Sequence, residues 1–139
     1  MKSKKINTDL YKRLYRAKEF IDDQFCEQID LNQISKEACI SPYHFLRVFH
    51  KVYNKTPHRY LTEKRIDKAK ELLGNDSMSV TEVCYDVGFE SLGSFSALFN
   101  KRVGLSPVSY RAETLRKVLI SINFPEKLVP GCFLLFPSF

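Results

Sequence analysis

Several features of metal-binding, secreted and membrane proteins are missing from this sequence. Its cysteines, Cys26, Cys39, Cys84 and Cys132, form no C-x-x-C pair and have no histidines at ligand spacing, so a metal site is not expected. No apolar run approaches the roughly 18 residues of a membrane span, and the amino-terminal segment lacks the apolar stretch of a signal peptide. These absences favour a cytoplasmic protein with reduced thiols, no membrane association and no cofactor.

Composition and charge favour a small, basic, globular protein. With 139 residues, the chain has room for one or two small domains, and a hydrophobic fraction of 44% is enough for a packed core. Eleven phenylalanines and no tryptophan suggest that this core is built on Phe. The formal net charge is +6 and the isoelectric point is about 9.2. A basic balance favours a polyanionic partner such as nucleic acid.

Apolar periodicity and helix capping signals predict an all-α fold of about seven helices. Asp30 with Gln33, and Ser79 with Glu82, have the spacing of a capping box. Ser-Pro and Thr-Pro pairs mark three further helix starts. The predicted helices cover residues 8–26, 31–39, 56–73, 79–88, 91–103 and 106–119. A further helix begins at Ser41, and the loop that follows it leads to residue 56. Cys39 falls on the apolar face of the helix at 31–39 and is expected to pack as a small hydrophobe.

A repeat at an offset of fifty residues is the most informative feature of the chain. Residues 34–60 and 84–110 align without a gap, and each contains two predicted helices separated by a tight turn, the pattern of a helix-turn-helix. The identical pairs are Ser41/Ser91, Phe45/Phe95, Phe49/Phe99, Lys51/Lys101, Pro57/Pro107 and Tyr60/Tyr110. Two copies of one unit in a small chain indicate two copies of one role.

The repeat divides the chain into four parts. Residues 1–55 hold an N-terminal helix and the first helix-turn-helix, 56–74 form a long connecting helix, 75–119 hold the second helix-turn-helix and a closing helix, and 120–139 are an apolar tail. Lys64, Arg65 and Lys68 on the connecting helix are expected to form a solvated face. For the tail, docking on the helical body, a dimer contact and disorder all remain open.

The second repeat resembles the signature of the AraC/XylS transcription regulators. The matching residues are Val87–Ser91, Ser94–Ser96, Phe99–Lys101 and Gly104–Arg111, and the resemblance covers about residues 8–116. It implies a bacterial DNA-binding protein with two helix-turn-helix motifs that binds promoters and most often activates transcription, with RNA polymerase as a further partner. Because 139 residues leave no room for a separate effector domain, the chain is similar to the short stand-alone members.

Candidate base-reading residues follow from the exposed face of each second helix, since a recognition helix enters the major groove with its N-terminal half toward the bases. In the first motif they are Tyr43, Leu46, Arg47 and His50, and the resemblance implies the same role for the first three. In the second motif they are Leu92, Gly93, Ser96, Ala97 and Asn100. Arg47 suits a bidentate contact to guanine, although a contact to phosphate or solvent remains open.

Gly93 and Ala97 have no polar side-chain group that could contact a base, whereas the family usually has larger polar residues at these two positions. We therefore predict that the first motif carries most of the direct sequence specificity, and that the second depends on phosphate contacts and DNA shape.

Phosphate contacts are expected from short polar residues at helix N-termini and from nearby cations. The candidates are Ser41, Pro42, Lys51, Thr56, His58, Ser91, Lys101, Arg102, Ser106 and Arg111. If the connecting helix sets the recognition helices about 34 Å apart, they enter successive major grooves of an asymmetric site of roughly 15–20 bp. One chain then fills both grooves, so we expect a monomer on double-stranded DNA rather than a dimer.

Two other functions remain as alternatives. A basic helical protein-interaction module is the first, and it lacks the steep salt dependence of phosphate binding. An enzyme that uses Cys39 or Cys84 with a histidine is the second, but no orienting acid accompanies either cysteine. The predicted function is therefore a sequence-specific DNA-binding regulator, an activator rather than an enzyme.

Overall fold

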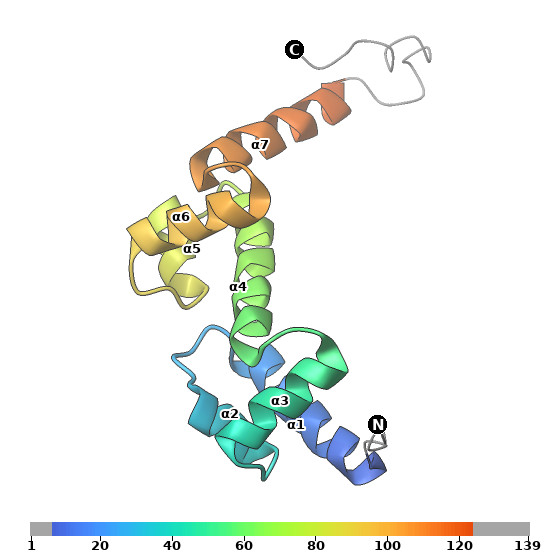
Figure 1. Ribbon diagram of the computed structural model, residues 1–139. Helices are drawn as coiled ribbons and strands as arrows, with labels where there is room; N and C mark the ends of the chain where they lie inside the picture. Colours follow the sequence, from blue (N-terminus) through green and yellow to red (C-terminus); the bar gives the residue numbers. More distant parts are fainter. Residues whose placement is uncertain (1–6, 124–139) are drawn as a thin grey trace.

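The predicted all-α fold with seven helices is confirmed. The computed structural model describes residues 7–123, and no strand occurs among them. The helices are α1 (Thr8–Gln24), α2 (Leu31–Glu37), α3 (Pro42–Tyr53), α4 (Pro57–Leu73), α5 (Val80–Asp86), α6 (Leu92–Val103) and α7 (Pro107–Asn123). Figure 1 shows α4 as a central rod, with α1–α3 around its first end and α5–α7 around its second.

Most helix starts lie where the capping signals predict them. Asp30 and Ser79 both form capping boxes, with each side chain accepting a hydrogen bond from the backbone N–H three residues later. Ser41 precedes α3 as expected, but its hydroxyl makes no capping hydrogen bond. The ends differ more: α1 stops at Gln24, two residues early, and α7 continues to Asn123, four residues into the predicted tail. The rest of the tail, 124–139, lies outside the described residues.

Each helix-turn-helix packs around its own pair of phenylalanines. In the first unit the ring centres of Phe45 and Phe49 are 5.3 Å apart, and in the second those of Phe95 and Phe99 are 5.6 Å apart. All four side chains are fully buried. The connecting helix α4 contributes Leu61 to the first core and Ile66, Ala69 and Leu73 to the second. The fold therefore has two small cores joined by one helix that both of them share.

The gapless alignment of the two repeats is wrong for the first helix of each motif. The turn between α2 and α3 has four residues (38–41), whereas the turn between α5 and α6 has five (87–91). As a result, Ile34 is equivalent to Val83 and Ile40 to Phe89, an offset of 49 rather than 50. Equivalent turn hydrogen bonds agree, because Ile40 N–H donates to Ser35 and Phe89 N–H to Cys84. The six identical pairs begin at Ser41/Ser91, where the turns end, so they could not reveal that the second turn is one residue longer than the first.

Cys39 does not pack as a small hydrophobe. It follows α2 in the turn, is exposed, and has a left-handed backbone with φ of 51°. The equivalent residue in the second motif is Gly88, with φ of 91°, which suits this conformation because glycine has no Cβ. The backbone demands of the turn, rather than a helical face, therefore decide the position of Cys39.

The end of α1 is tied to the start of α4 by a polar cluster around Asp22. This carboxylate accepts hydrogen bonds from the Tyr60 hydroxyl at 2.7 Å and from the ammonium groups of Lys18 at 2.9 Å and Lys64 at 3.0 Å. Burial alone raises the pKa of Asp22, but these three hydrogen bonds outweigh it and hold the pKa below its usual value. Lys64 therefore makes a tertiary contact rather than belonging to a purely solvated face.

Candidate nucleic-acid interface

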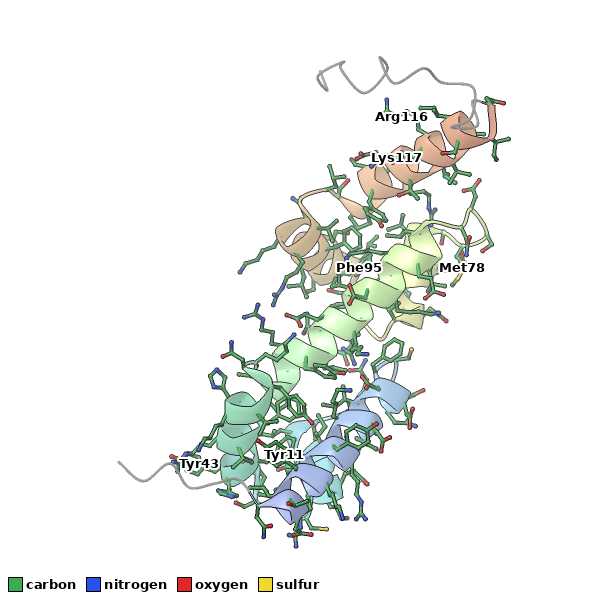
Figure 2. The ribbon with its side chains drawn as sticks, turned by 90° about the vertical axis from the view of Figure 1, so that its right-hand side faces the viewer. Tyr11, Tyr43, Met78, Phe95, Arg116 and Lys117 are labelled. Atoms are coloured by element: carbon green, nitrogen blue, oxygen red, sulfur yellow. The ribbon has the colours of Figure 1, made fainter. Side chains whose placement is uncertain are left out.

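The second helices of the two motifs, α3 and α6, lie on the same side of α4. Figure 2 shows both to the left of the connecting helix, whereas α1 and α5 lie on the opposite side. Because α4 contributes to both cores, the two motifs are attached to one helix. The arrangement suits an extended ligand that crosses α3 and α6 in turn.

The residues predicted to read bases on α3 form its outward face. Tyr43 is 73% exposed, Arg47 and His50 are exposed, and Leu46 is half-buried. The Arg47 guanidinium lies 5.8 Å from the centre of the Tyr43 ring, so a cation–π contact orients it along the surface. Tyr43 points away from the body of the protein in Figure 2. The structure thus brings this whole predicted set together.

The outward face of α6 is much emptier. Leu92, Gly93, Ala97 and Asn100 are exposed, and Ser96 is half-buried. A Cβ placed on Gly93 would meet no other atom within 4 Å. Packing therefore does not require glycine at position 93, and a larger side chain would have room there.

Most predicted phosphate-binding residues surround these two faces. Ser41, Lys51, Thr56, His58, Ser91, Lys101 and Arg102 are exposed, and Pro42 and Ser106 are half-buried. The Thr56, Ser91 and Ser106 hydroxyl oxygens each accept a backbone N–H three residues later, at 3.2, 3.2 and 3.1 Å. These residues cap α4, α6 and α7, so they fix the helix N-termini that are expected to meet phosphates.

Arg111, which is also predicted to contact phosphate, makes a contact within the protein. Its guanidinium donates to the backbone carbonyl of Met78, in the loop before α5, and its side chain is half-buried. Arg111 therefore ties α7 to the loop before α5, and its phosphate role stays a prediction. The sequence pattern gave no sign of this contact, because its partner is a backbone atom 33 residues away.

An ion-pair cluster that the sequence did not reveal lies between the two motifs. Glu63 on α4 accepts hydrogen bonds from Lys55 and from Arg59, the latter at 2.9 Å, and lies 3.8 Å from Arg102 on α6. The hydrogen bond from Lys55, the largest influence, lowers the pKa of Glu63. Three cations around one carboxylate leave a positive surface between α3 and α6, which suits a polyanion that spans both helices.

Residues 7–123 show no group of three or more His, Cys, Asp and Glu side chains placed to hold a metal ion. Within the same part of the chain, no helix combines the length and apolar character needed to cross a membrane.

Comparison with known proteins agrees with this geometry. Residues 34–113 match the model of a family described as a helix-turn-helix domain, and this match covers more than half of the chain. The chain is 35% identical over 99 residues to the HTH-type transcriptional regulator YdeC of Bacillus subtilis, covering 71% of this chain and 34% of the relative. It is 32% identical over 108 residues to the HTH-type transcriptional activator RhaS of Salmonella arizonae, covering 75% and 37%.

Solved structures show the same fold. The DNA-binding domain of AdpA, a global transcriptional factor solved in complex with a target DNA, matches with a TM-score of 0.69 and 26% identity, over 82% of this chain and 97% of that one. The C-terminal domain of AraT, a response regulator from Geobacillus stearothermophilus, matches with a TM-score of 0.69 and 27% identity, over 73% and 84%. The chain spans about a third of the length of the curated relatives it matches.

Proposed function

This chain belongs to the AraC/XylS family of helix-turn-helix transcription regulators, and on that premise we propose that it binds one asymmetric DNA site through α3 and α6. The observation that carries the proposal is the common orientation of these helices on one shared rod, α4. Each would enter one of two successive major grooves on the same face of the duplex. A structural relative described as bound to a target DNA supports double-stranded DNA as the ligand.

The two motifs are proposed to contribute unequally to sequence specificity. On α3, Tyr43, Arg47 and His50 offer an aromatic ring, a guanidinium and an imidazole to the groove. On α6, the positions of Gly93 and Ala97 present no polar group, so only Ser96 and Asn100 remain as hydrogen-bonding readers. The first motif would read bases directly, and the second would depend more on phosphate contacts and DNA shape.

Activation of transcription with RNA polymerase as the partner is proposed from the relatives, one of which is named a transcriptional activator. A monomer is proposed as the bound form, because the chain supplies both recognition helices itself. A dimer would double the site and make it symmetric.

Selection from a pool of random duplexes tests the proposal. The purified protein is incubated with the pool at two salt concentrations and the bound duplexes are sequenced. We expect enrichment of an asymmetric site with two blocks about one helical turn apart and stronger base preference in one block. Salt-sensitive binding without any enriched sequence would contradict sequence-specific reading, and no binding at either salt would contradict DNA as the ligand.

Replacement of Arg47 by alanine is expected to weaken binding to the selected site by about 1–3 kcal/mol and to relax the preference at one base pair, because a bidentate guanine contact is lost. The measurement is the dissociation constant on the selected site and on its single-base variants. Lys51→Ala is the matched control on the same helix, and it should weaken binding to all these duplexes by a similar factor. An equal loss on all sequences for Arg47→Ala would show that Arg47 contacts phosphate.

A further inference from the structure

The connecting helix passes between the two cores through a segment with little apolar support. Leu61 is the last α4 residue in the first core, and Ile66 is the first in the second. Residues 62–65 therefore join the two subdomains, and segments with few buried apolar contacts are where a structure deforms most easily. Any relative motion of the two motifs would concentrate here.

Arg65 lies in this segment and is not the solvated cation that its sequence position suggests. Its side chain is half-buried, its Nε donates to the Phe25 carbonyl at 2.7 Å, and its Nη2 donates to the Glu27 carbonyl at 2.8 Å. Both carbonyls follow α1, which has no basic residue in its last turn. Arg65 supplies the positive charge that the C-terminal end of a helix favours, and so fastens α1 to α4.

The same arginine also contacts the turn of the second motif. Its guanidinium carbon lies 5.8 Å from the centre of the Phe89 ring, which in turn packs 5.2 Å from the Phe95 ring of α6. A second link runs in parallel, because the Gln28 side-chain amide donates to the Gly88 carbonyl at 2.8 Å. The loop after α1 in the first subdomain is therefore joined to the helix-turn-helix turn of the second.

The approach of these two segments is close enough to require glycine at position 88. A Cβ there would be 2.6 Å from the Cys26 carbonyl oxygen and 3.1 Å from the Arg65 guanidinium carbon, and the backbone φ of 91° also favours glycine. We call residues 25–28, Arg65 and residues 88–89 the inter-motif junction.

We propose that the inter-motif junction, through Arg65 and Gln28, sets the spacing and rotation between α3 and α6 and so determines the DNA spacing that the protein accepts. The inference rests on the proposed function, since it assigns positioning residues for the same DNA site. One base pair inserted between the two blocks shifts one block by about 3.4 Å and rotates it by about 35°. Two hydrogen bonds hold the Arg65 guanidinium against the loop after α1, and from there the Arg65–Phe89 contact and the Gln28–Gly88 hydrogen bond reach the second motif and resist such a shift.

The first test measures dissociation constants for the selected site and for versions with one base pair added or removed between its blocks. The wild-type protein is expected to lose affinity about tenfold or more at either altered spacing, because the DNA must deform to fit a rigid protein. Arg65→Met and Gln28→Ala are expected to bind the best spacing more weakly, but to lose less than about threefold on changing it. Gln28→Ala removes a single hydrogen bond and tests the inference even if Arg65→Met destabilises the fold.

Lys68→Met is the control, since it also replaces a cation of α4 by methionine, three residues further along the helix, where the lysine pairs with Glu71. It should keep the wild-type spacing penalty. If Arg65→Met and Gln28→Ala also keep that penalty, or if Lys68→Met relaxes it equally, the inference is overturned.

The second test needs no DNA. Backbone residual dipolar couplings, measured by NMR on a chain of 16.2 kDa, report whether two subdomains share one orientation. We expect one alignment tensor to fit both subdomains in the wild type and in Lys68→Met, and two different tensors in Arg65→Met. A single tensor in Arg65→Met overturns the inference. If the wild type selects no two-block site, the proposed function fails, while the dipolar couplings still decide whether the junction orients the motifs.

Discussion

Replacement of Phe99 by alanine is expected to lower the free energy of unfolding by about 3–5 kcal/mol, because it removes a fully buried aromatic ring and leaves a cavity. The ring packs 5.6 Å from Phe95 and 5.5 Å from Tyr110, so its loss also removes two aromatic contacts. For a small two-core protein this is a large share of the total stability. Urea unfolding followed by circular dichroism measures the change.

The repeat supplies an internal control for this prediction. Phe49 occupies the equivalent position in the first core, with contacts to Phe45 and Tyr60, and Phe49→Ala should cost a similar amount. Exposed Tyr43→Ala should change stability by less than about 0.5 kcal/mol. If Phe99→Ala had an effect as small as that of Tyr43→Ala, the second core would not be a packed structure in solution.

Raising the salt concentration from 50 to 200 mM is expected to weaken binding to the selected site by about 150-fold. This follows if about four cations neutralise phosphates, because each contributes about −0.9 to the slope of log affinity against log salt. Lys51, Lys101 and Arg102 are the exposed candidates around the two recognition helices, with a further contribution from Lys55 and Arg59 beside Glu63. The measurement is a titration series at four or five salt concentrations.

Lys101→Ala should reduce the slope of the salt dependence by about 1, whereas Lys68→Ala, on a part of α4 assigned no DNA contact, should leave the slope unchanged. A slope near zero for the wild type would contradict phosphate neutralisation. That result would favour the alternative of a helical module that binds another protein.

Helix type and position could be predicted because their causes are local. The capping boxes at Asp30 and Ser79, and the Pro residues that begin α3, α4 and α7, satisfy or remove N-terminal amide donors within one turn of the same helix. The outward face of α3 could be predicted for a similar reason, because burial of Phe45 and Phe49 fixes the opposite side of a helix by its 3.6-residue period.

Contacts between residues far apart in sequence could not be predicted. Arg65 and Arg111 each donate to backbone carbonyls more than thirty residues away, and a carbonyl has no residue type that a sequence pattern can reveal. The extra residue in the turn between α5 and α6 was also missed, because Ser41 and Ser91 end the two turns and align at the same offset of fifty as the identical pairs that follow them. The end of α7 was misplaced because apolar residues continue past Leu119 without a stop signal.

Two helix-turn-helix motifs on a shared helix could be predicted from the sequence alone, because periodicity, caps and the repeat are encoded in neighbouring residues. The same patterns predicted which residues α3 offers to a ligand and how few α6 offers. How the two motifs are held relative to each other depends on tertiary contacts that no local pattern encodes. The contacts that hold them, from Arg65 and Gln28 to backbone carbonyls and around the Gly88 turn, exist only once residues 25–28 and 88–89 have been brought together by folding.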